Sequence, residues 1–61
     1  MTTLQEAIIH ILEEEGFGSD LDPFEVAVGC MTIGLTAEWV NEVTGFDFTD
    51  DEVVTAVETL L

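Results

Sequence analysis

Apart from carboxylates and hydroxyl groups, this chain has only two side chains typical of nucleophilic or acid–base catalysis. The sequence holds one histidine, His10, and one cysteine, Cys30. Covalent or acid–base catalysis needs such a group paired with a partner in a pocket, and neither residue has one nearby in the sequence. We therefore expect His10 on a helix surface or at the core edge, Cys30 as a small buried apolar side chain, and no enzyme activity.

The carboxylates lack the spacing of a metal-binding loop. The segment Ser19-Asp20-Leu21-Asp22 is too short for an EF-hand and lacks the closing glutamate. A single cysteine excludes an internal disulfide and a multi-cysteine zinc site. We expect no metal and no cofactor.

Charge is the unusual property of the sequence. There are fourteen acidic residues and no lysine or arginine, so the formal net charge is −14 at pH 7. An average chain of this length would carry about seven basic residues. Proteins that hold nucleic acid by its phosphates do so with lysine and arginine. The composition therefore excludes this kind of nucleic-acid binding and indicates a basic protein partner.

The acidic residues form clusters, and helix stability explains only one of them. Residues 50–52 stand at the start of a predicted helix, where negative charge is favourable. Residues 13–15 stand at a predicted helix end, where cations are preferred, and Glu38 and Glu42 repel each other one turn apart. Carboxylates one helical turn apart form a rigid row of negative charges, which resembles the row of phosphates along a nucleic-acid strand. The predicted partner-binding residues are Glu13, Glu14, Glu15, Glu38, Glu42, Asp47, Asp50, Asp51 and Glu52.

Two large apolar residues lie near these charges. Trp39 is expected to seal the junction of the third and fourth predicted helices as a core-edge aromatic. If it is exposed beside Glu38 and Glu42, it becomes a possible anchor for a partner. Met31 is expected to fill space in the core.

Capping signals predict the elements that position these residues. Thr3 with Glu6, Asp22 with Glu25, and Thr49 with Glu52 have the spacing of capping boxes, and Thr36 begins another helix. Gly16, Gly34 and Gly45 follow the expected helix ends. The signals predict an all-α fold, a compact bundle of four short helices at about residues 4–15, 23–33, 37–44 and 50–61.

Apolar spacing predicts which faces are buried. The first helix carries an apolar stripe from Leu4 to Leu12. Residues 24–33 are apolar on nearly every side, which indicates the most buried helix. The last helix has its apolar face on Val53, Val54, Ala56, Val57, Leu60 and Leu61.

The length of 61 residues allows one domain, residues 1–61, with a single core. The sequence has no apolar run of about 18 residues, and it starts without a basic region or an apolar signal core. We expect no membrane association and a cytoplasmic location, in the host cell cytoplasm if a phage encodes the chain.

Residues 35–61 resemble the helix-turn-helix unit of winged-helix and repressor domains through Gly45 and their apolar spacing. In that family basic residues of the second helix grip DNA phosphates. Here the corresponding stretch begins Asp50-Asp51-Glu52 and has no basic residue. The resemblance therefore does not extend to DNA binding.

Small size, acidity from Glu6 to Glu58 and the lack of catalytic residues resemble the small phage-encoded inhibitors that include DNA-mimic and anti-CRISPR proteins. The resemblance implies a non-enzymatic inhibitor, a monomer or homodimer, that occupies the basic site of a nucleic-acid-binding protein such as a CRISPR effector subunit.

Other functions fit the composition as well. The acidity also fits a soluble protein-interaction or oligomerisation module from a salt-adapted organism, in which the second or fourth helix pairs between subunits. An enzyme or a metal protein would need His10, Cys30 and a carboxylate to meet in one pocket.

Overall fold

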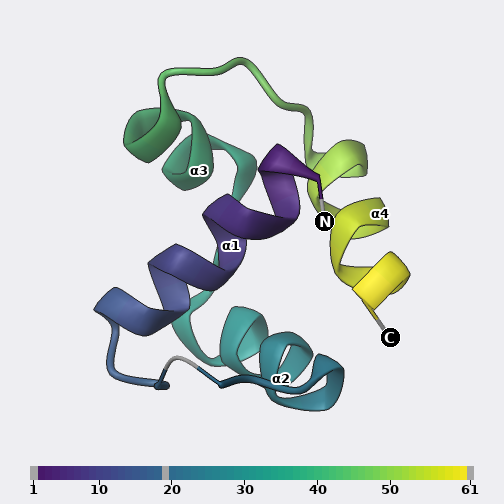
Figure 1. The fold of residues 1–61 in the computed structure, drawn as a ribbon. Helices are drawn as coiled ribbons and strands as arrows, with labels where there is room; N and C mark the ends of the chain where they lie inside the picture. Colours follow the sequence, from purple (N-terminus) through teal and green to yellow (C-terminus); the bar gives the residue numbers. More distant parts are fainter. Residues whose placement is uncertain (1, 19, 61) are drawn as a thin grey trace.

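The computed structural model describes residues 2–18 and 20–60, and this part of the chain forms four α-helices and no strand. The helices are α1 (Thr3–Glu14), α2 (Pro23–Ile33), α3 (Ala37–Thr44) and α4 (Asp50–Leu60) (Figure 1). The predicted all-α bundle of four short helices is confirmed, with helix bounds within about one residue of those expected. Two residues named above lie outside the described residues: Leu61, the predicted last residue of the fourth helix, and Ser19, the first residue of the segment Ser19-Asp20-Leu21-Asp22.

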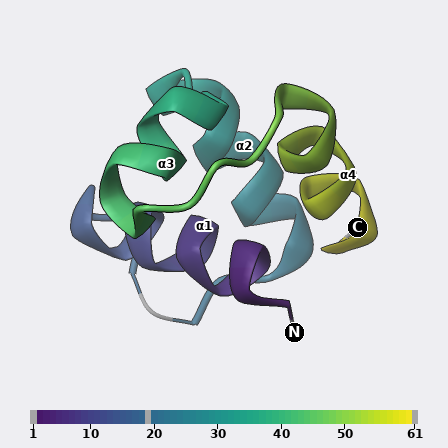
Figure 2. The same ribbon diagram turned by 90° about the horizontal axis from the view of Figure 1, so that it is seen from above.

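The central helix is α1. It packs against α2, α3 and α4. It crosses the centre of Figure 1, and in Figure 2 it runs along the lower side of the molecule, below the other three helices. Its predicted apolar stripe is buried at Leu4, Ile8, Ile11 and Leu12. Each such side chain contributes about 1.5–3 kcal/mol on burial. The packing of α1 on all three other helices therefore forms most of the core.

The prediction that residues 24–33 form the most buried helix is wrong. In α2 only Val26 and Gly29 are buried. This helix packs chiefly against α1 and α4, so its opposite side faces solvent. Met31, expected in the core, is 82% exposed. Four short helices cannot surround one of their number completely, and α1 occupies the central place.

The approach of α2 to α1 depends on a residue without a side chain. A Cβ atom at Gly29 would lie 2.8 Å from Cδ2 of Leu12, which is fully buried. That distance is shorter than van der Waals contact, so a larger residue at this position would require the buried Leu12 side chain or one of the two helices to shift.

The start of α1 differs from its prediction by one residue. Thr2, not Thr3, is the N-cap, and Gln5, not Glu6, completes the capping box. The Oε1 atom of Gln5 accepts a hydrogen bond from the Thr2 amide, and its Nε2 atom donates to the carbonyl oxygen of Ala56 in α4. Gln5 is buried between the two helices, whereas a glutamate in that place would have no proton to donate to Ala56.

The other three helices begin at the predicted caps. The Asp22 and Thr36 side chains accept hydrogen bonds from the amides of Glu25 and Trp39. Thr49 and Glu52 form the predicted capping box of α4. Among the described residues, no helix has both the length and the apolar character needed to span a membrane.

Candidate acidic interface

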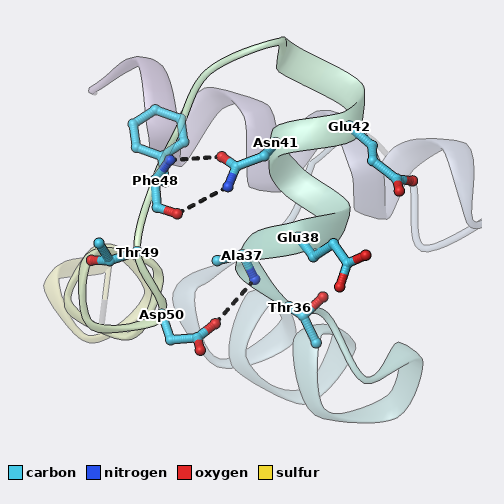
Figure 3. A pocket seen from close by; sticks show the side chains of 8 residues that line it. All are labelled: Thr36, Ala37, Glu38, Asn41, Glu42, Phe48, Thr49 and Asp50. Atoms are coloured by element: carbon cyan, nitrogen blue, oxygen red, sulfur yellow. Dashed lines mark hydrogen bonds between the residues drawn. The ribbon is translucent and has the colours of Figure 1, made fainter.

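The larger of two hollows that flank α3 has a volume of about 770 Å³ and lies between α3 and the start of α4 (Figure 3). Its lining includes Glu38, Asn41, Glu42, Phe48, Thr49 and Asp50. Glu38 and Glu42 project from α3 on the side away from Phe48 and Thr49 (Figure 3). Glu38, Glu42 and Asp50 are the three acidic residues at this hollow, and none of its lining residues is basic.

Side-chain bonds to the backbone hold this hollow in shape. The Oδ1 atom of Asn41 accepts from the Phe48 amide at 2.7 Å, and its Nδ2 atom donates to the Phe48 carbonyl oxygen at 2.9 Å. A carboxylate oxygen of Asp50 accepts a longer bond, 3.4 Å, from the Ala37 amide. Residues 45–49 are thereby tied to α3, and the negative charge of Asp50 stands at the positive end of the α3 dipole.

The smaller hollow, of about 280 Å³, lies between α3 and the end of α1. It is lined by His10, Ile11, Glu14, Glu15, Trp39 and Val43. Trp39 is half-buried at the edge of the core, as expected. It lies at the junction of α1 and α3, however, and not at the predicted junction of the third and fourth helices, because α3 packs on α1.

The structure brings part of the predicted partner-binding set together. Glu14, Glu15, Glu38, Glu42 and Asp50 border the two hollows beside α3. We call these five residues the α3 acidic face.

The remaining predicted residues lie elsewhere. Asp51 and Glu52 line a separate hollow between the start of α1 and α4. Asp47 stands in the segment before α4, and Glu13 is exposed on α1; neither lines these hollows. Successive helix residues point about 100° apart, and the neighbours Asp50 and Asp51 accordingly line different hollows.

All fourteen acidic side chains of the chain are exposed. Among the described residues, His10 lies nearest to forming an ion pair: its Nε2 atom lies 3.7 Å from Oε1 of Glu14 on the surface of α1, and the contact is ionic only when the imidazole is protonated. Near the start of α2, the charge of Asp22, followed by desolvation and a hydrogen bond to Asp22, raises the pKa of the Glu25 carboxyl above its ordinary value. The charge of Asp22 thus disfavours the ionised form of Glu25.

No protein-family model, curated protein or solved structure matches this chain. The helix-turn-helix and phage-inhibitor resemblances therefore stay predictions.

His10 and Cys30 do not meet. His10 is exposed beside Trp39, whereas Cys30 lines a groove between α2 and α4. Cys30 is only half-buried, less than expected, and this burial raises the pKa of its thiol. In residues 2–18 and 20–60, no three histidine, cysteine or acidic side chains form a group that could hold a metal ion.

Two kinds of residue were not predicted correctly from the sequence. Asn41 and Gln5 link distant segments, and no local pattern distinguishes them from other polar helix residues. The apolar pattern of the sequence predicts a buried position for four side chains that are exposed in the structure: Phe24, Val28, Met31 and Val54. For α2 the sequence did contain a signal. A helix that is apolar on nearly every side has more apolar surface than packing on one side can bury.

Proposed function

We propose that this chain is a non-catalytic inhibitor that uses its negative surface to occupy a basic, nucleic-acid-binding site on another protein. The observation that supports the proposal is the exposure of all fourteen carboxylates in a chain without lysine or arginine. No internal ion pair with lysine or arginine can neutralise them, so their field extends into solvent.

The α3 acidic face is the surface that we assign to the basic site. Glu38 and Glu42 stand one helical turn apart, a Cβ separation of about 5–6 Å, on a helix fixed by the Asn41–Phe48 bonds. The half-buried Trp39 lies beside Glu14 and Glu15 at the edge of this face. A rigid row of charges beside an aromatic side chain combines fast electrostatic encounter with an apolar anchor.

The experiment has two steps. The immobilised chain captures proteins at about 0.05 M salt, a concentration at which charge attraction is weakly screened, and a salt gradient elutes them. Each captured protein is then tested for loss of a labelled DNA or RNA ligand when the free chain is added. We expect competition that weakens steeply with salt.

Two variants with equal charge test the surface. One carries Glu14→Gln, Glu15→Gln, Glu38→Gln and Glu42→Gln on the α3 acidic face. The control carries Glu6→Gln, Asp20→Asn, Glu25→Gln and Glu58→Gln, which are exposed elsewhere. We expect the first variant to weaken competition by about tenfold or more and the control to weaken it far less. Equal losses would mean that net charge alone, and no particular face, drives binding.

A second function, a protein-interaction or oligomerisation module, is favoured by one observation. Phe24 and Met31 on α2 and Val54 on α4 are 72%, 82% and 54% exposed. Large apolar side chains that gather on a surface mark contact with another molecule. Sedimentation over a range of protein concentrations tests this function. If the chain oligomerises, its apparent mass rises with concentration.

A further inference from the structure

An apolar stripe runs along the solvent side of α2. Phe24, Val28 and Met31 are all exposed, and their spacing of four and then three residues places them on one face of the helix. This stripe does not belong to the α3 acidic face. It has no role in the electrostatic inhibition proposed above.

The stripe opens into a groove between α2 and α4. This groove has a volume of about 360 Å³, and its lining is mainly apolar. Ala27, Cys30 and Met31 line it from α2, and Val54, Val57 and Glu58 line it from α4. Met31 belongs to both the stripe and the groove, so the two form one continuous apolar surface.

Carboxylates border this surface on both helices. On α4, Asp51 precedes Val54 by three residues and Glu58 follows it by four, so both lie next to Val54 on the helix surface. On α2, Glu25 follows directly after Phe24 and is exposed. The surface therefore has an apolar centre and a negative border.

The charge of the border decides what can cover the surface. A second copy of the chain would bring its own fourteen carboxylates against these, with no lysine or arginine to pair with them, and like charges brought together oppose association. An anionic lipid surface is repelled in the same way. A helix with an apolar face and basic flanks satisfies both the centre and the border.

We propose that the groove between α2 and α4 binds an amphipathic helix of another protein, whose apolar face is bordered by lysine or arginine. The apolar face of the guest covers Met31 and Val54, and its basic flanks face Asp51 and Glu58. The flexible Met31 side chain allows the groove to adapt to guests of different shape.

The probe is a labelled synthetic peptide of about 18 residues, long enough to form a helix, with leucines on one helical face and lysines elsewhere. A scrambled peptide of the same composition has the same charge but no apolar face. Fluorescence anisotropy at about 0.15 M NaCl, where the Debye length is about 8 Å, measures binding. We expect the amphipathic peptide to bind at least about tenfold more tightly than the scrambled one.

A pair of charge-matched variants separates the groove from general attraction. The Met31→Glu, Val54→Glu variant adds two negative charges within the groove, and the control Thr32→Glu, Thr59→Glu adds two at other exposed helix positions. All four sites are exposed, and circular dichroism checks that both variants fold. We expect about tenfold weaker peptide binding for the groove variant and unchanged or tighter binding for the control.

Three results would overturn the proposal. The first is equal binding of the scrambled peptide. The second is tighter binding by the Met31→Glu, Val54→Glu variant, as attraction by charge alone demands. The third is a stable dimer of the chain that excludes the peptide, because a second copy then covers the groove. The variant of the α3 acidic face leaves the groove between α2 and α4 unchanged. Peptide binding by this variant therefore tests the groove separately from the inhibitor proposal.

Discussion

Among single residues, Asn41 links α3 to the segment that precedes α4. Its amide group pairs with both the N–H and the C=O of Phe48, much as a neighbouring strand would pair with an extended segment. Residues 45–49 are not helical, so their backbone groups need such partners. Asn41 thereby sets the position of Asp50 and the shape of the larger hollow.

Asn41→Asp is expected to destabilise the fold by about 1–3 kcal/mol. The substitution keeps the shape but replaces the Nδ2 donor with an oxygen, which then faces the Phe48 carbonyl oxygen. Urea denaturation measures the free energy of unfolding. The neighbouring Glu42→Gln, at an exposed position, serves as the control and should change stability by no more than about 0.5 kcal/mol. Equal effects of the two substitutions contradict the role assigned to Asn41.

A second residue-scale prediction concerns pH. Because Asp22 raises the pKa of Glu25 in the folded state, the folded chain holds this proton more tightly than the unfolded chain. The contribution of this proton binding to the free energy of unfolding is complete below the ordinary carboxyl pKa, and it is lost as pH rises through the raised pKa of Glu25. Asp22→Asn keeps a good N-cap but removes the charge. We expect the pKa of Glu25 to fall in this variant, measured by NMR titration of its side-chain carbon; an unchanged pKa argues against Asp22 as the cause.

At the element scale, α2 ends by a local mechanism. Gly34 adopts the left-handed conformation, with φ 64° and ψ 43°. The amides of Gly34 and Leu35 then donate to the carbonyls of Met31 and Cys30, the pattern of a Schellman motif. This end turns the chain toward α3 and so sets where the groove between α2 and α4 closes.

Gly34→Ala is expected to lower stability by about 1 kcal/mol, and Gly34→Asn by less. A Cβ atom here would meet nothing within 4 Å, so the cost is that of the backbone conformation alone, which asparagine tolerates better than alanine. Thermal unfolding followed by circular dichroism measures both variants. Equal melting temperatures for alanine and glycine would show that the left-handed turn is not required.

At the scale of the whole molecule, the net charge acts on a very small body. The principal extents are 26, 21 and 20 Å. The Debye length is about 30 Å at 0.01 M salt and about 10 Å at 0.1 M. At the lower concentration every carboxylate therefore interacts with every other, whereas at the higher one only neighbours interact.

We expect the melting temperature to rise between about 0.01 and 0.1 M NaCl, by roughly 4–8 °C for each kcal/mol of repulsion that is screened. Calorimetry or circular dichroism in a dilute buffer measures the shift. A melting temperature that stays flat in this range and rises only at molar salt would indicate adaptation of the surface to high salt instead of simple repulsion.

The fold class, the helix bounds to within about one residue, and the sign of the surface charge could all be predicted from the sequence. Asp22, Thr36 and Thr49 act on amides within one turn of themselves, so their effect on the helices depends little on tertiary contacts. Composition likewise determines that no lysine or arginine can balance the acidic residues. Helix caps depend on neighbouring residues, and net charge is a sum over all residues. Both can therefore be predicted from the sequence.

Which helix is central and which apolar side chains are exposed depend instead on how the helices pack. Met31 and Val26 belong to the same apolar segment, yet one is exposed and the other is buried, because packing on α1 and α4 covers one side of α2. Contacts over long sequence separations, such as Gln5 to Ala56, likewise have no local pattern. The five residues of the α3 acidic face and the groove between α2 and α4 arise from how the helices are arranged, which no single segment encodes.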